Sequence, residues 1–163
     1  MNYIFLDIDG VMNNKQDWLA KKNKSTGKFD NACMFCDQAW QMLSDVCKAT
    51  DARIILSSSW RLGLKEDGDR IYALFTNEEK LLNYFDKYEI RLVALTDNKG
   101  STRGKQIIRF VKDYLTPYDD YVVLDDEDFD IANYIPKEQF IKTEFETGLQ
   151  PEHCKRIIDY FNK

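Results

Sequence analysis

The stretch YIFLDIDGV, residues 3–11, is a short apolar run that ends in two acids separated by one residue. The apolar run predicts a buried β-strand over residues 3–6. Residues two apart on a strand point to the same side, so the carboxylates of Asp7 and Asp9 should lie together beyond its carboxyl end. Open α/β sheets bind ligands at that end, and two close like charges require a cation or a proton between them. An ordinary acidic turn after an edge strand is the alternative interpretation.

The rest of the chain alternates short apolar runs with longer amphipathic stretches. Further strands are predicted at residues 53–56, 91–95, 121–124 and 139–141, and helices at 37–50, 77–88, 104–115 and 151–161. Strands that alternate with helices are joined by right-handed crossovers, which gives a mostly parallel sheet with helices on both faces. The predicted fold is therefore α/β, a three-layer Rossmann-like domain around a central, mostly parallel five-stranded sheet.

One segment interrupts this alternation. Residues 12–36 are mostly polar, rich in lysine and without a clear period, which predicts a flap or irregular insertion over one end of the sheet. No internal repeat and no linker rich in proline or glycine divides the sequence. We therefore expect one domain that spans residues 1–163.

Composition narrows the class of protein. A net charge of −5 argues against a surface that coats nucleic acid, because phosphate backbones are bound by clustered lysine and arginine. No apolar run is long enough to cross a membrane, so we expect a cytoplasmic protein with no membrane association. Its four cysteines should be free thiols; Cys33 and Cys36 have the CxxC spacing, but Cys47 and Cys154 do not complete a usual zinc pattern.

Two segments rich in hydroxyls and cations adjoin other predicted elements. The segment SSSWR, residues 57–61, follows a predicted strand, and a serine there can donate a hydrogen bond to a phosphoryl oxygen. The segment TRGK, residues 102–105, opens a predicted helix whose N–H groups and cations favour an anion. A solvated helix cap and a basic helix end that faces water are the respective alternatives.

The segment YVVLDDEDFD, residues 121–130, is an apolar strand that ends in a carboxylate cluster. Five acids in six positions are costly to hold together without a hard cation. A charge run is usually a solvated face, but this one begins directly at the predicted strand end. Two strands that each end in paired aspartates, with serine and basic segments between them, indicate a site rather than four coincidences.

Taken in order, these four segments resemble the four motifs of the haloacid dehalogenase (HAD) superfamily. More narrowly, the chain resembles the phosphatase-type HAD domains of Swiss-army-knife RNA repair proteins, and polynucleotide kinase-phosphatases carry a related domain. The segments that carry the narrower resemblance are residues 6–11, 57–61, 103–107, 124–126 and 147–149. The resemblance implies a Mg²⁺-dependent phosphatase that acts through an aspartyl-phosphate.

The resemblance also implies roles for the acids. Asp7 would be the nucleophile and a Mg²⁺ ligand, and Asp9 the general acid and base, with its backbone carbonyl on the metal. Asp126 would be a direct metal ligand and Asp130 the second acid of the fourth motif, with Asp125 as a supporting carboxylate. An acid at position 9 favours ester hydrolysis over dehalogenation, since only the former needs a proton shuttle.

The resemblance also implies phosphate-binding roles for residues of the second and third motifs. Ser57 would hold the phosphoryl group, although Ser58 is an alternative because the serines are consecutive. Arg103 matches the basic third motif best, and Lys105 is the alternative.

The nature of the substrate follows from the short insertions. Neither residues 12–35 nor residues 95–103 provide a full cap, so the site should be open to the end of a large molecule. Residues 13–30 carry five lysines against two aspartates, which suits a phosphate-rich substrate, although a solvated lysine-rich loop explains them equally. The leading hypothesis is a 3′-phosphatase of RNA or DNA ends that works with kinase or ligase repair partners. The alternatives are a phosphatase of nucleotides or other small metabolites, and an inactive module that binds a phosphorylated ligand.

Overall fold

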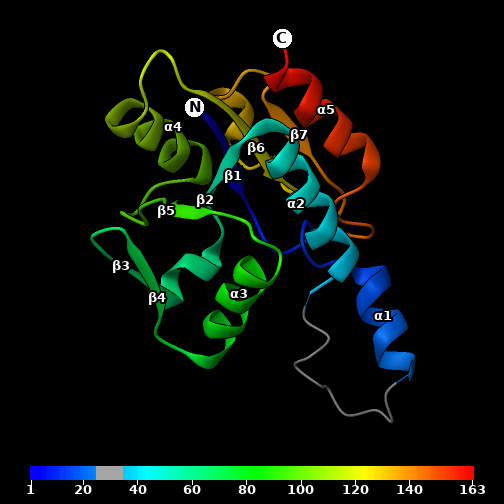
Figure 1. Cartoon of the computed structure of the whole chain (residues 1–163). Helices are drawn as coiled ribbons and strands as arrows, with labels where there is room; N and C mark the ends of the chain where they lie inside the picture. Colours follow the sequence, from blue (N-terminus) through cyan, green and yellow to red (C-terminus); the bar gives the residue numbers. More distant parts are fainter. Residues whose placement is uncertain (25–34) are drawn as a thin grey trace.

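The computed structural model describes residues 1–24 and 35–163, without the side chains of residues 22–24. Within these ranges one sheet of five parallel strands has the order β5-β2-β1-β6-β7 (Figure 1). The strands are β1 (Asn2–Leu6), β2 (Ala52–Leu56), β5 (Leu92–Leu95), β6 (Asp120–Asp125) and β7 (Phe140–Lys142). The predicted α/β class and the five-stranded parallel sheet are therefore confirmed.

The two faces of the sheet bury different apolar sets, because successive strand residues point to opposite sides. Ile4, Leu6 and their counterparts on β2 and β6 pack in one cluster with α2 (Asp37–Thr50), α3 (Thr76–Lys87) and α5 (Pro151–Phe161). Phe5, Ile55 and Val123 pack on the other face with α4 (Arg103–Tyr114) and the 3₁₀ helix η3 (Ile131–Asn133). Figure 1 shows α2 and α5 on one side of the sheet and α4 on the other, which makes three layers.

The strand order changes direction at β1. From β1 the chain proceeds to β2 and β5 on one side, and later to β6 and β7 on the other. Such a switch point leaves a crevice at the carboxyl ends of the strands. The backbone hydrogen bonds between the strands continue one residue beyond the strand ends. Ser57 N donates to Leu6 O and Asp7 N donates to Leu124 O, both at 2.9 Å.

Part of the predicted flap is regular. Residues Lys15–Lys24 form the helix α1, so the expectation of irregular structure is wrong for this part. Asn14 Oδ1 accepts a hydrogen bond from Asp17 N at 2.8 Å, and Lys21 pairs with Asp17 one turn along the helix at 2.9 Å. Local polar contacts therefore stabilise a helix that lacks a clear apolar face. Lys28 and Cys33 lie outside the described residues.

A small hairpin and a 3₁₀ helix follow β2. The 3₁₀ helix η2 (Ser59–Gly63) leads into the antiparallel pair β3 (Leu64–Asp67) and β4 (Arg70–Ala73), which the sequence interpretation left unassigned. The turn between the strands consists of Gly68 and Asp69, and Gly68 has φ +60°. Such a glycine-containing two-residue turn is a hairpin signal that could have been used.

The described helices include none that combines the length and apolar character of a membrane span. Cys36, Cys47 and Cys154 are free thiols, and burial raises the pKa of Cys47 to about 12.

Candidate active site

Three carboxylates converge at the crevice. Asp7 follows β1, Asp125 ends β6 and Asp126 is the next residue, and one oxygen from each lies within 4.8 Å of the others. Burial and the charge of Asp7 raise the pKa of Asp125 to about 7, and burial with the same charge raises that of Asp126 to about 6. Burial also raises the pKa of Asp7 itself, against the effect of nearby donors. We call these three acids the acid trio.

The register of β1 and β6, and the alternation of side chains along each strand, explain why the carboxylates of Asp7 and Asp125 lie close together. Leu6 pairs with Leu124 in the parallel register, so the next residues along each strand are neighbours. Residues two apart on a strand point to the same face, so Asp7 shares the face of Phe5 and Asp125 shares the face of Val123. Both carboxylates therefore lie on the face covered by α4.

Gly10 makes room for the third member of the trio. Its φ is +77°, and a Cβ at this position would lie 2.3 Å from Asp126 Oδ2. Thr143 Oγ1 donates to Gly10 O at 2.8 Å and holds the turn from the side of β7. A residue with a side chain would be strained here and would push the Asp126 carboxylate away.

Arg103 supplies a cation to the trio. It is the first residue of α4, and its Nη1 donates to Asp125 Oδ2 at 2.7 Å and to Asp7 Oδ1 at 3.2 Å. The ring of Phe129 lies against the guanidinium, with its centroid 5.3 Å from the guanidinium carbon. Lys105 is exposed on the same helix, so of the two basic candidates Arg103 is the one that contacts the acids.

The two serine candidates have different surroundings. Ser57 is fully buried, and its hydroxyl has no hydrogen-bond partner among residues 1–24 and 35–163. Ser58 hydrogen-bonds the carboxylate of Asp7, and its Oγ accepts from Trp60 N at 3.4 Å at the start of η2. An unsatisfied buried hydroxyl is costly, so Ser57 is the serine with a free donor for a ligand.

Asp9 is exposed and is not a member of the trio, but it lies close enough for its charge to raise the pKa of Asp7 and of Asp126. Its carboxylate accepts hydrogen bonds from Trp60 Nε1 at 3.1 Å and from Asn13 Nδ2 at 2.7 Å. Asn13 Oδ1 in turn accepts a hydrogen bond from Gly10 N at 2.9 Å, so the turn at residues 7–10 orients the side-chain amide of Asn13. Sequence reasoning missed both donors, although an Asn four residues after Asp9 in a turn is a signal for such a contact.

Arg61 is a second residue that sequence reasoning missed. It is buried, and its guanidinium donates to Ser57 O at 3.2 Å, to Ser58 O at 2.6 Å and to Gln106 Oε1 at 2.9 Å. Burial and the charge of Arg103 lower the pKa of Arg61. These bonds join the serine segment to the first turns of α4, so Arg61 positions Ser57 relative to Arg103.

Asp130 does not join the trio. Its carboxylate accepts hydrogen bonds from Gly104 N at 2.7 Å and from Thr102 Oγ1, at the amino end of α4. Burial opposes ionisation there, but these two hydrogen bonds outweigh it and hold the pKa of Asp130 below its usual range. The carboxylate therefore anchors the helix that carries Arg103, as expected for an acid at a helix amino end.

The donor set suits a hard divalent cation. Mg²⁺ prefers carboxylate oxygens and usually retains several waters. The acid trio offers three such oxygens. Burial and the charge of Asp7 raise the pKa values of Asp125 and Asp126, and a bound cation would counter both effects by favouring the ionised carboxylates.

Comparison with known proteins gave one family. Residues 3–154, nearly the whole chain, match the family model described as the HAD domain in Swiss Army Knife RNA repair proteins. Comparisons with curated proteins and with solved structures gave no match.

Proposed function

Because the chain belongs to the family of HAD domains in Swiss Army Knife RNA repair proteins, we propose that it is a Mg²⁺-dependent phosphatase of polynucleotide 3′ ends. The observation that carries the proposal is the acid trio beside Arg103 and the unpartnered hydroxyl of Ser57. A carboxylate nucleophile, a cation and a buried donor are what phosphoryl transfer requires at one point.

Asp7, Asp125 and Asp126 would hold Mg²⁺, together with the backbone carbonyl of Asp9. When bound, the metal would neutralise the charge between the attacking carboxylate and the phosphate. The hydrogen bonds of Asp130 give it a second role at α4, and substitution decides whether it also binds metal.

The chain's own residues would carry out the reaction in two steps. An Asp7 oxygen attacks phosphorus, an aspartyl-phosphate forms, and the bond to the leaving oxygen breaks as protonated Asp9 delivers its proton to that oxygen. Asp9 then takes a proton from water, which attacks phosphorus and releases Asp7 and inorganic phosphate. Arg103 and Ser57 would stabilise the equatorial oxygens in both steps.

The choice of substrate rests on the family and on the short insertions of the sequence, from which we expect an open site. The lysines of the predicted flap whose side chains are described are engaged: Lys15 pairs with Glu146, and Lys21 pairs with Asp17 and donates to Phe35 O. Binding of the oligonucleotide backbone by this flap would then depend on residues 22–28, whose side chains are not among those that the structure describes. Cytoplasmic location and cooperation with kinase or ligase partners remain part of the proposal.

A release assay tests the reaction. Inorganic phosphate is measured with Mg²⁺ and oligonucleotides that carry 3′ or 5′ phosphates, and with nucleoside monophosphates. We expect the highest kcat/KM for oligonucleotide 3′-phosphates, loss of activity with EDTA, and an acid-stable phosphoenzyme from labelled substrate. Asp7→Asn should form no phosphoenzyme and retain less than about 1% of the activity, because the covalent nucleophile is lost.

The other outcomes separate the alternatives. Equal kcat/KM for mononucleotides and oligonucleotides would favour a phosphatase of small metabolites. Binding of phosphorylated oligonucleotides without any release of phosphate would favour an inactive binding module.

A further inference from the structure

A hollow lies directly beside the proposed phosphate site. It has a volume of about 640 Å³, and Arg103 lines it together with Thr102, Ser59, Asn98, Leu62 and Phe129. Arg103 also donates hydrogen bonds to Asp7 and Asp125, so this one side chain borders both the hollow and the proposed reaction centre. Its size lies within the range of small-molecule sites, which extends from about 300 to about 1,000 Å³.

Two large apolar side chains are exposed in this hollow. Phe129 is 62% exposed and Leu62 is 56% exposed, although folding normally removes such side chains from water. Phe129 also has φ +40°, in the left-handed region that non-glycine residues rarely adopt. Strain of this kind persists where the surrounding structure enforces it, and it concentrates at ligand sites.

The arrangement of the hollow suits a planar ligand attached to a phosphate. Arg103 lies against the ring of Phe129 and also reaches Asp7, so a phosphate held there would place its substituent near the ring. The hydroxyl of Ser59 and the amide of Asn98 add hydrogen-bonding groups to the lining. An aromatic ring, an aliphatic neighbour and a few polar groups are the elements of a sequence-tolerant base-binding site.

We propose that this hollow binds the terminal nucleotide of the substrate, with its base stacked on Phe129 beside Leu62. The inference rests on the proposed phosphatase function and adds the group through which a nucleotide end is distinguished from other phosphate esters. The enzyme would accept any base, because every base presents a stacking face.

The test compares two oligonucleotides that differ only at the 3′-phosphorylated residue, which carries a base in one and is abasic in the other. For the wild type we expect kcat/KM to be about tenfold higher with the base. Phe129→Leu keeps an apolar side chain but removes the ring, so the ratio between the two substrates should fall toward one. Phe129→Trp keeps a stacking surface and should preserve the ratio.

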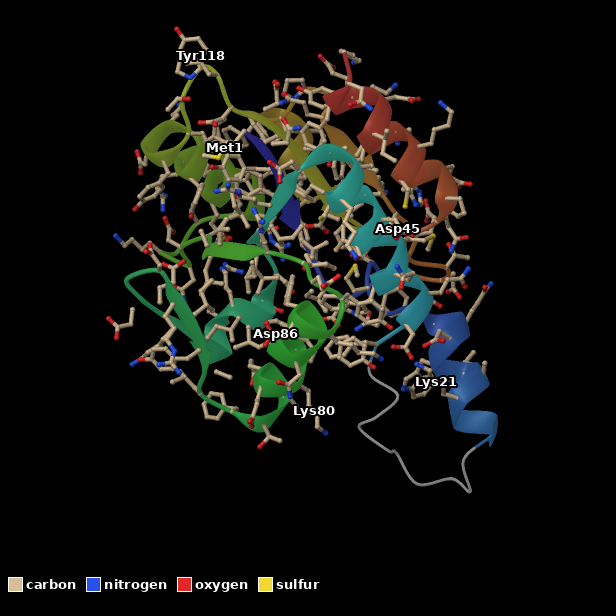
Figure 2. The ribbon with its side chains drawn as sticks, viewed as in Figure 1. Met1, Lys21, Asp45, Lys80, Asp86 and Tyr118 are labelled. Atoms are coloured by element: carbon tan, nitrogen blue, oxygen red, sulfur yellow. The ribbon has the colours of Figure 1, made fainter. Side chains whose placement is uncertain are left out.

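The control is Tyr118→Leu. Tyr118 is 90% exposed, and its carbonyl accepts from the amino group of Met1, at the amino end of β1 opposite the site. Figure 2 shows Tyr118 and Met1 close together at the top of the view, away from the lower end toward which β1 runs. This variant should leave the ratio unchanged.

Binding provides a second measurement that does not need turnover. In the Asp7→Asn background, fluorescence anisotropy should show weaker binding of the abasic oligonucleotide, and Phe129→Leu should remove the difference. A wild-type ratio of one in both measurements overturns the base site while leaving the phosphatase proposal intact. If Phe129→Leu lowers kcat/KM equally for the base-carrying and the abasic oligonucleotide, the base site is also overturned, because the ring would then act only through Arg103. Absence of both phosphate release and binding would contradict the proposed function as well.

Discussion

The guanidinium of Arg103 donates a hydrogen bond at 2.7 Å to the carboxylate of Asp125, whose residue surface is fully buried. The same nitrogen reaches Asp7, so one cation is shared between an acid of β6 and the proposed nucleophile. A buried charge left without its partner is strongly destabilising, which makes this pair a structural element as well as a chemical one.

Arg103→Met should therefore lower both activity and stability. Because the pKa of Asp125 is about 7, this acid can become neutral when the cation is missing. The loss of unfolding free energy should accordingly be larger at pH 8 than at pH 5, as measured by urea unfolding at the two pH values. Arg109→Met is the control, since Arg109 pairs with Asp97 at the surface and should cost less than about 1 kcal/mol at either pH. An equal loss at pH 5 and pH 8 would contradict the electrostatic account of the pair.

The metal-free protein should lose stability as pH rises. Asp125 and Asp126 have folded-state pKa values of about 7 and about 6, against 3.8 for an unperturbed aspartate. Between these values the folded state holds more protons than the unfolded state, so the unfolding free energy decreases from about pH 4 to about pH 7. Thermal melts in EDTA should show this fall, and millimolar Mg²⁺ should reduce it near pH 7. Melting temperatures that rise over this interval in EDTA would refute the assignment.

Asp126→Asn should separate stability from function. The substitution removes one charge and one ligand while it nearly preserves shape, so the metal-free variant should melt at or above the wild-type temperature. Mg²⁺ should raise its melting temperature less than that of the wild type, and catalysis should fall steeply. Full activity in the variant, or no response of the wild type to several millimolar Mg²⁺, would show that Asp126 is not a ligand.

Asp130→Ala tests whether Asp130 anchors α4 or binds metal. Loss of the acceptor for Gly104 N and Thr102 Oγ1 should cost about 1–2 kcal/mol at pH 7. Because the folded-state pKa of Asp130 is lowered, this stabilisation is present at neutral pH and is lost as pH falls through that value, so the variant and wild type should converge in acid. Isothermal titration should give unchanged Mg²⁺ affinity, and a loss comparable to that of Asp126→Asn would identify Asp130 as a ligand. The exposed Asp128, paired with Lys142, provides the control substitution Asp128→Ala.

Gly10→Ala should damage the site more than a comparable glycine substitution elsewhere. Gly10 and Gly68 both have positive φ, but a Cβ on Gly68 meets nothing within 4 Å, whereas one on Gly10 overlaps Asp126. We expect a loss of about 1 kcal/mol for Gly68→Ala, from backbone conformation alone, and about 2–4 kcal/mol for Gly10→Ala. Urea unfolding measures both, and Mg²⁺ binding should weaken only in Gly10→Ala. Equal costs would mean that the Asp126 carboxylate moves aside without penalty.

Much of the fold is encoded locally. The apolar runs in residues 3–6, 53–56 and 121–124 can be recognised as strands because each strand buries both faces, and the acids that end two of these strands mark the site before any contact is known. Apolar patterning did not predict α1, because local contacts of Asn14 and Asp17 stabilise this helix rather than an apolar face.

Other features depend on register and on side chains brought together from distant segments. The pairing of Leu6 with Leu124 puts Asp125 beside Asp7. The placement of α4 lets Asp130 accept a hydrogen bond at the amino end of that helix instead of joining the trio. The contacts of Arg61 with Gln106 and of Trp60 with Asp9 join residues more than 40 positions apart. No periodicity along the chain encodes such contacts, because they arise from the order and stagger of strands, which tertiary packing decides.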